Sequence, residues 1–139
     1  MNKQTILFLC THNAARSQMA EGLVNAQYGD RYVARSAGSE PTEVHPCALE
    51  VMAELGIDIS RQRAKSLSEF EDSFFDYVVT MCADAAENCP IFPGGATYLQ
   101  HPFDDPAVSA GWGAGECAHF RYVRDQIGKW IEATFSHSH

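Results

Sequence analysis

The chain has few positive charges and no long apolar run. Ten of its 139 residues are Lys or Arg and 18 are Asp or Glu, so the formal net charge is -8 at pH 7. This charge excludes a basic surface for nucleic acid, and a bound anion would need amide groups and one or two cations placed locally. No apolar run approaches the roughly 20 residues that cross a bilayer. The start "MNKQT" also lacks the pattern of a signal peptide. We therefore expect a cytoplasmic protein that does not bind membranes.

The cysteines are odd in number, which leaves at least one of them unpaired. There are five, at positions Cys10, Cys47, Cys82, Cys89 and Cys117. A static disulfide framework is not expected in a reducing cytoplasm, so catalytic, redox and metal-binding roles have to be weighed for each. Spacing suggests no partner for Cys117, and Cys47 is interpreted as a packing residue of a helix.

Strand-like and helix-like segments alternate along the whole chain. Short apolar runs predict strands over residues 5–9, 32–38, 75–82 and 97–99. Apolar residues at helical spacing predict helices over 16–28, 45–56 and 116–135, with a short helix over 66–72. No repeat or linker interrupts the pattern, which predicts one domain over residues 1–139. The alternation predicts an α/β three-layer sandwich, in which a four-stranded parallel sheet carries helices on both faces.

The segment "CTHNAARS", residues 10–17, lies between the first predicted strand and the first predicted helix. Backbone N–H groups and the positive end of a helix dipole form a binding site for a tetrahedral oxyanion. Arg16 adds a planar fork that can hold two oxygens, and Ser17 can donate a hydrogen bond to the sulfur of Cys10. We therefore expect Cys10 to be a thiolate nucleophile. The residues expected to bind the anion are Thr11, His12, Asn13, Ala14, Ala15, Arg16 and Ser17. The alternative is a buried, inert Cys10 with an ordinary helix-start arginine.

These residues resemble the phosphate-binding loop of low-molecular-weight tyrosine phosphatases and of the arsenate reductases that share their fold. The resemblance continues through "SAGSEP", "HPCALEVMAELGIDIS", "VVTMCADAAENCP" and "FDDPA", and it covers the chain from Ile6 to about Ile131. It is strongest toward the thioredoxin-coupled arsenate reductases. It implies the strand order 2-1-3-4, arsenate as substrate with phosphate or sulfate competing, thioredoxin as reductant, no tightly bound cofactor and a monomer.

Cys82 and Cys89 distinguish a reductase from a phosphatase, because a phosphatase needs neither. Seven residues apart on a helix, they would be separated by roughly 10 Å, so a disulfide between them would require the segment to unwind. The resemblance implies a relay in which Cys82 attacks the sulfur of Cys10 and Cys89 then attacks Cys82. A zinc site with His101 and a purely structural role are the alternatives.

One further catalytic residue is implied by the resemblance. Asp105, directly before Pro106 in "FDDPA", corresponds to the acid that protonates the departing oxygen. A turn-forming Asp-Pro without catalytic function is the alternative, and Asp104 is not expected to act.

Related reductases bind potassium beside the loop, and this chain keeps three of the corresponding residues. These are Asn13, Glu21 and Ser36, but Lys65 occupies the position of an aspartate. The ammonium of Lys65 could replace the ion and pair with Glu21. A solvated surface lysine is the alternative.

The sequence thus predicts reduction of arsenate to arsenite. The alternatives are a low-molecular-weight tyrosine phosphatase, and a non-catalytic sensor that binds an oxyanion or a metal.

Overall fold

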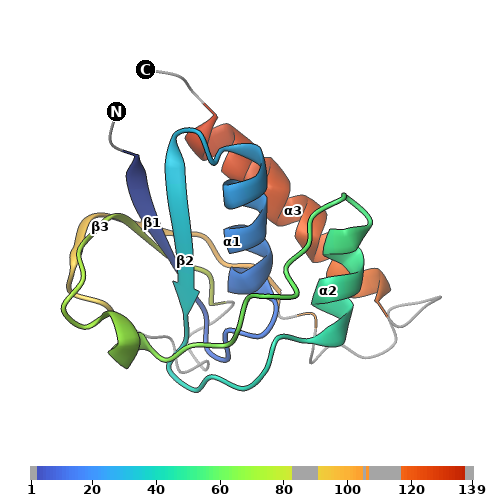
Figure 1. Cartoon of the computed structure of the whole chain (residues 1–139), viewed down its shortest axis with the longest axis horizontal. Helices are drawn as coiled ribbons and strands as arrows, with labels where there is room; N and C mark the ends of the chain where they lie inside the picture. The colour runs from blue at the N-terminus through green and yellow to red at the C-terminus, as the bar shows by residue number, and fades with distance from the viewer. Residues whose placement is uncertain (1–2, 83–90, 105, 107–116, 137–139) are drawn as a thin grey trace.

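The structure is a computed structural model, and it describes residues 3–82, 91–104, 106 and 117–136. Its elements run along the chain as strand β1 (Gln4–Leu9), helix α1 (Arg16–Gln27), strand β2 (Tyr32–Ala37), helix α2 (Pro46–Ala53), 3-10 helix η1 (Leu67–Phe70), strands β3 (Phe75–Thr80) and β4 (Gly95–Gln100), and helix α3 (Ala118–Phe135) (Figure 1). The expected alternation of strands and helices is confirmed, with element ends shifted by a few residues. Among the described residues, none of the helices combines the length and apolar character of a membrane span.

The four strands form one parallel sheet in the order β2-β1-β3-β4, as expected. β1 lies inside the sheet, where Leu9 is in register with Ala37 of β2 and with Thr80 of β3. Residues 6–9 of β1 are completely buried, which explains why its sequence is a continuous apolar run. Because parallel strands end at the same edge, the residues after Leu9, Ala37 and Thr80 meet there.

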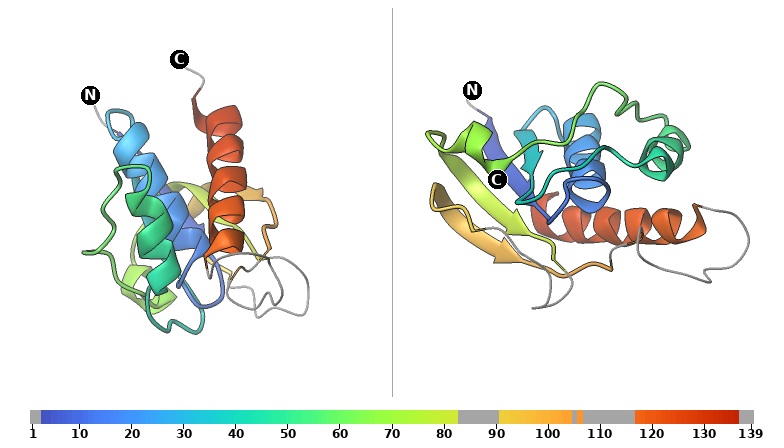
Figure 2. Two further views of the ribbon diagram at one scale, coloured as in Figure 1. Left: turned by 90° about the vertical axis from the view of Figure 1, so that its right-hand side faces the viewer. Right: turned by 90° about the horizontal axis from the view of Figure 1, so that it is seen from below.

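The two faces of the sheet are covered differently. The side chains of Ile6 and Phe8 share a large core with α1, α2 and α3, and Figure 2 shows these three helices gathered on one side of the sheet. Leu7 and Leu9 point the other way, into a smaller cluster against which η1 packs. Helical cover of the second face therefore consists, among the described residues, of the single 3-10 turn of η1.

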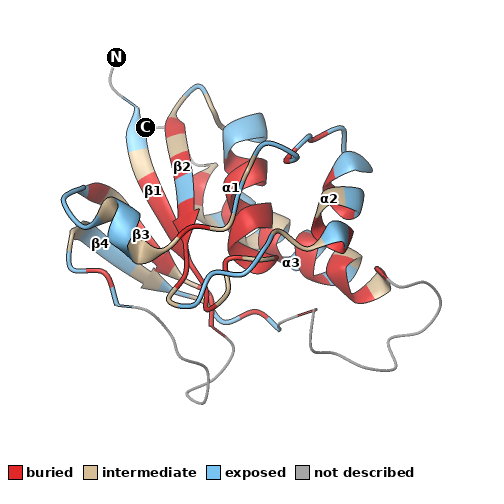
Figure 3. Ribbon diagram, turned by 60° about the horizontal axis from the view of Figure 1, so that its bottom comes forward, coloured by how far each residue is buried: buried red, intermediate tan, exposed pale blue. Residues whose placement is uncertain are grey.

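Burial is highest where the strands meet the helices on the first face, and α1 is the most enclosed helix (Figure 3). The first nine residues of α1 are all buried, polar ones included. Polar side chains cost free energy when buried unless they are hydrogen-bonded. This end of α1 therefore needs polar partners, and they lie in the candidate site.

Candidate active site

The loop of residues 10–15 connects β1 to α1 at the carboxyl edge of the sheet. Cys10 N–H donates to the carbonyl of Ala37 on β2 (3.3 Å), and Met81 N–H donates to the carbonyl of Leu9 (2.9 Å). Gly38 follows β2 and lies against the loop. A Cβ at position 38 would come within 2.5 Å of the carbonyl oxygen of Thr11. Glycine is thus required there by close backbone approach.

The outer side of the loop is hydrogen-bonded to the segment before α2. The carbonyls of Thr11, His12 and Ala14 accept the N–H groups of residues 40, 42 and 45 at 2.9, 3.1 and 2.9 Å. In a planar trans peptide the carbonyl and the following N–H point in opposite directions. The N–H groups of His12, Asn13 and Ala15 therefore point away from this segment and into the loop, where they can bind an anion.

Cys10 is a buried free cysteine, and the hydroxyl of Ser17 lies close to its sulfur. Cys10 is 2% exposed, and its Sγ lies 2.8 Å from the Oγ of Ser17. Asn13 Nδ2 donates to the same Oγ at 2.7 Å. Because that hydroxyl accepts from Asn13, its own hydrogen is available for the sulfur. The Ser17 hydroxyl is therefore placed to donate a hydrogen bond to the sulfur of Cys10.

Asn13 is itself held in place by bonds that the sequence did not reveal. Its Oδ1 accepts the backbone N–H of Lys65 (2.8 Å) and Nε2 of Gln18 (2.9 Å). Gln18 also donates to the carbonyl of Arg63 at 2.8 Å. The backbone of Asn13 has a φ of 52°, in the left-handed region that asparagine tolerates better than most residues. Residues 63–65 thereby orient the amide that orients Ser17.

Arg16 is the cation of the site. It is 2% exposed, and its Nη1 donates to the carbonyls of Met81 (3.3 Å) and Phe103 (3.2 Å). These carbonyls follow β3 and β4, so the guanidinium spans the carboxyl edge of the sheet. The guanidinium is fixed by the fold before any anion binds, which reduces the entropy lost on binding.

A cavity of about 410 Å³ opens above the loop. Its floor consists of Cys10, His12, residues 14–15 and Arg16, and its side is the segment 42–46, which we name the pocket wall. Residues 42–45 of the wall have no regular secondary structure, and Pro46 is the first residue of α2. Sequence analysis missed the wall, because its contribution depends on the backbone bonds described above and not on a motif.

Cys82 lies two residues beyond β3, at the same edge as Cys10. It is 5% exposed and disulfide-bonded, whereas Cys10 is free. Cys89 and Asp105, the other two expected catalytic residues, lie outside the described residues. Asp104 is exposed, and its Oδ2 lies 3.8 Å from Nε2 of His119.

Lys65 is buried beside the loop, which contradicts the interpretation of a solvated surface lysine. It is 8% exposed, and its Nζ donates to the carbonyl of Arg63 (2.9 Å) and lies 3.5 Å from Oε1 of Glu21. The same carboxylate oxygen accepts the hydroxyl of Ser36 at 2.6 Å. Glu21, Ser36, Asn13 and Lys65 therefore form one cluster behind the loop.

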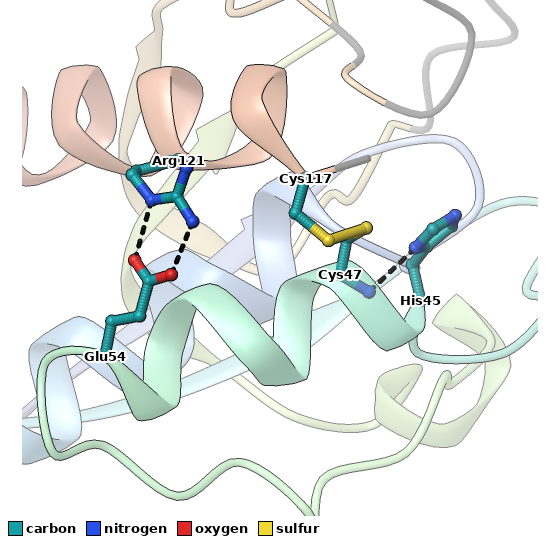
Figure 4. Close-up of a disulfide and its surroundings, with 5 residues drawn as sticks. All are labelled: His45, Cys47, Glu54, Cys117 and Arg121. Carbon is teal, nitrogen blue, oxygen red and sulfur yellow. Dashed lines mark hydrogen bonds and ion pairs between the residues drawn. A yellow bond between two sulfur atoms is a disulfide. The ribbon is translucent and has the colours of Figure 1, made fainter. Parts of the chain in front are cut away.

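Cys47 and Cys117 form a disulfide, which the sequence analysis did not predict. The two cysteines are 70 residues apart, and their Cα atoms lie 5.3 Å apart because the first turn of α2 packs on the residue before α3 (Figure 4). Both cysteines lie at the start of a predicted helix, and this shared position was the sequence feature that could have suggested the pairing. No spacing rule connects two such positions.

The described residues contain no group of three or more His, Cys, Asp or Glu side chains that could hold a metal ion. Of the three residues considered for zinc, Cys82 is disulfide-bonded, His101 lies after β4, and Cys89 is outside the described part.

Comparison with known proteins agrees with this geometry. Residues 5–101 match the family of low molecular weight phosphotyrosine protein phosphatases. An arsenate reductase of Halalkalibacterium halodurans is 45% identical over 132 residues, which are 95% of this chain and 95% of that protein. A solved arsenate reductase in the phosphate binding state superposes with a TM-score of 0.81 at 28% identity, covering 96% of this chain and 97% of that one. A thioredoxin-dependent arsenate reductase of Corynebacterium glutamicum is 31% identical with a TM-score of 0.71, covering 98% of this chain and 61% of that one. The chain therefore belongs to the low molecular weight phosphotyrosine protein phosphatase family and, within it, to the arsenate reductases.

Proposed function

We propose that this protein reduces arsenate to arsenite, with Cys10 as the nucleophile and Cys82 and Cys89 as the relay. The observation that supports the proposal is a free, buried Cys10 under a cavity that Arg16 also lines, with a disulfide-bonded cysteine, Cys82, at the same edge of the sheet. A phosphatase needs the first of these cysteines and not the second. The arsenate reductases to which the chain is similar support the same conclusion.

The first step is attack by the Cys10 thiolate on arsenic(V). Arg16 and the loop N–H groups bind the arsenate oxygens and stabilise the charge that develops on them. An S–As bond forms, and one oxygen leaves as water after it is protonated. Asp105, which precedes Pro106, is proposed as the acid that supplies this proton.

The second step transfers two electrons to arsenic. The thiolate of Cys82 attacks the Cys10 sulfur, and the electron pair of the S–As bond stays on arsenic, which leaves as arsenite. A Cys10–Cys82 disulfide results. Cys89 then attacks Cys82, which releases the Cys10 thiolate and moves the disulfide to Cys82 and Cys89. A free Cys10 beside a disulfide-bonded Cys82 is the combination expected after this transfer.

The remaining disulfide has to be reduced by an external dithiol, and we propose thioredoxin for this part. A thioredoxin-dependent arsenate reductase is among the similar structures. Two thiolate attacks, the first giving a mixed disulfide, return both cysteines to thiols and leave thioredoxin oxidised. A cytoplasmic location and action as a monomer belong to this proposal, with phosphate and sulfate as competing oxyanions and no other cofactor.

The deciding experiment follows NADPH oxidation with arsenate, thioredoxin and thioredoxin reductase. Wild type should turn over continuously, Cys10→Ser should be inactive, and Cys89→Ser should stop after about one turnover per enzyme, because the Cys10–Cys82 disulfide is then not resolved. Cys117→Ser is the matched cysteine control and should sustain turnover. Absence of arsenate-dependent oxidation in wild type, together with hydrolysis of an aryl phosphate, would assign the protein to the phosphatases.

We further propose that Lys65 supplies the positive charge that related reductases obtain from potassium. The buried Glu21 carboxylate needs a cation, and the Lys65 ammonium lies 3.5 Å from it. The backbone N–H of Lys65 also donates to Asn13, so the same residue supports the loop.

A further inference from the structure

The Cys47–Cys117 disulfide joins the pocket wall to α3. Cys47 directly follows residues 42–46, and His45 accepts the N–H of Cys47 through its Nδ1 at 3.0 Å. Cys117 directly precedes α3. Figure 4 shows the bond between the two helix starts, with His45 on the side of the wall. The disulfide is thus placed at the base of the wall.

The opposite end of α2 is attached to α3 without the disulfide. Glu54 accepts hydrogen bonds from Arg121 at 2.8 and 2.5 Å and from Arg124 at 2.9 Å. Arg124 also donates to the carbonyl of Val51 at 2.8 Å. Opening the disulfide therefore leaves α2 docked at its carboxyl end, while its amino end, where the wall ends, loses its covalent link to α3.

Most of the wall lies at the surface. Residues 42, 43 and 46 are exposed, Val44 packs against the main core, and the backbone N–H groups of residues 42 and 45 bind the loop. The ring of His45 lies 4.5 Å from the ring of Phe120 on α3. A covalent link at the end of such an exposed segment adds to these contacts in fixing its position, because each ordered residue costs conformational entropy.

We propose that Cys47 and Cys117 form a second redox site, separate from the Cys10, Cys82 and Cys89 relay, whose oxidation state sets the affinity of the pocket for oxyanions. A low-molecular-weight disulfide such as oxidised glutathione oxidises the two thiols by exchange, which leaves two glutathione thiols. A dithiol reverses the reaction by two successive thiolate attacks and is itself oxidised to a disulfide. In the disulfide form the end of the wall is fixed to the start of α3, and in the dithiol form this covalent attachment is lost and the wall is held by its noncovalent contacts alone.

The test measures binding of inorganic phosphate, so it does not depend on arsenate turnover. In a Cys82→Ser/Cys89→Ser background, alkylation should count one thiol in the oxidised protein and three in the reduced protein. Reduction should raise the phosphate Kd about three- to tenfold, because the wall then has to be ordered on binding. The matched control adds Cys47→Ser and Cys117→Ser to this background, and its Kd should be the same before and after reduction.

A second measurement covers the case in which phosphate binding is weak in this background. Hydrogen exchange at the amides of residues 42–45 should be faster in the dithiol form, while exchange in the last turns of α3 stays unchanged. Equal phosphate Kd values with equal exchange in the two forms would overturn the proposal. Three alkylated thiols after incubation with oxidised glutathione would overturn it as well, since the pair would then not be a redox site.

Discussion

The hydroxyl oxygen of Ser17 lies 2.8 Å from the sulfur of Cys10, and this contact connects the loop to the start of α1. Replacing Ser17 with alanine removes the donor and leaves the thiolate with one hydrogen bond fewer. A hydrogen bond to a charged group contributes about 1.5–3 kcal/mol, so alkylation of Cys10 at pH 7 should slow about tenfold or more. Iodoacetamide kinetics in a Cys82→Ser/Cys89→Ser background measures this rate. Ser60→Ala, an exposed serine, is the control and should react as the unmodified background does.

Asn13 has a left-handed backbone conformation and a side chain that donates a hydrogen bond to Ser17. Two substitutions separate the effect of the backbone from that of the side chain. Asn13→Gly keeps a φ of 52° accessible but removes the donor to Ser17. Asn13→Ala removes the same donor and adds a backbone cost of about 1–2 kcal/mol. Both variants should slow Cys10 alkylation, and only the alanine variant should also show the added loss of stability in thermal unfolding. A glycine variant that reacts as fast as wild type would show that the side chain is not needed.

The parts of the site that were predictable from sequence are those that are local in the chain. The loop of Cys10 to Ser17 is contiguous, and strand ends in a parallel sheet converge regardless of detail, so the positions of Cys10 and Cys82 followed from the pattern. The strand order came from resemblance to a known family. Local rules also found α1 and α3, whose apolar residues recur at helical spacing.

What was missed depends on long-range packing. The resemblance placed Lys65 beside Asn13 and Glu21, but the backbone hydrogen bond of Lys65 to Asn13, across 52 residues, was not expected. The contact of Cys47 with Cys117, across 70 residues, was not expected either. Each contact depends on how two segments that are distant in the sequence pack against α1 or α3. The spacing of residues along the sequence does not contain this information. The same reason accounts for the pocket wall, whose polar backbone groups bind the loop without any characteristic side chain.

Lys65 should make the enzyme independent of potassium. Arsenate reduction by wild type should be the same in potassium and sodium salts at equal ionic strength, because the ammonium already neutralises Glu21. Lys65→Asp should lower activity and restore a stimulation by potassium, and Lys129→Asp, on the exposed surface of α3, is the matched charge change without this effect. Strong stimulation of wild type by potassium would contradict the proposal.

The buried carboxylate also makes Lys65 important for stability. Lys65→Met removes the cation, while the hydroxyl of Ser36 still donates a hydrogen bond to Glu21. Loss of one partner of a buried ion pair costs about 3–5 kcal/mol. Urea unfolding should show a loss of this size at neutral pH, and a Glu21→Gln/Lys65→Met double variant should recover part of it, because the uncompensated charge is then gone.

Glu54 should give the packing of α2 on α3 a specific dependence on pH. Hydrogen bonds from Arg121, and then from Arg124, lower the pKa of Glu54 to about 2. A carboxylate whose pKa is lower in the folded protein stabilises the fold fully above its unfolded pKa of about 4.3, and the stabilisation is lost as the pH falls toward the folded value. The melting temperature of wild type should therefore exceed that of Glu54→Gln at pH 7, and the difference should shrink between about pH 5 and pH 2. Glu50→Gln, an exposed residue on the same helix, should show a smaller difference at pH 7. A Glu54→Gln difference that is constant from pH 7 to pH 2 would mean that the ion pairs with Arg121 and Arg124 do not contribute to the attachment of α2.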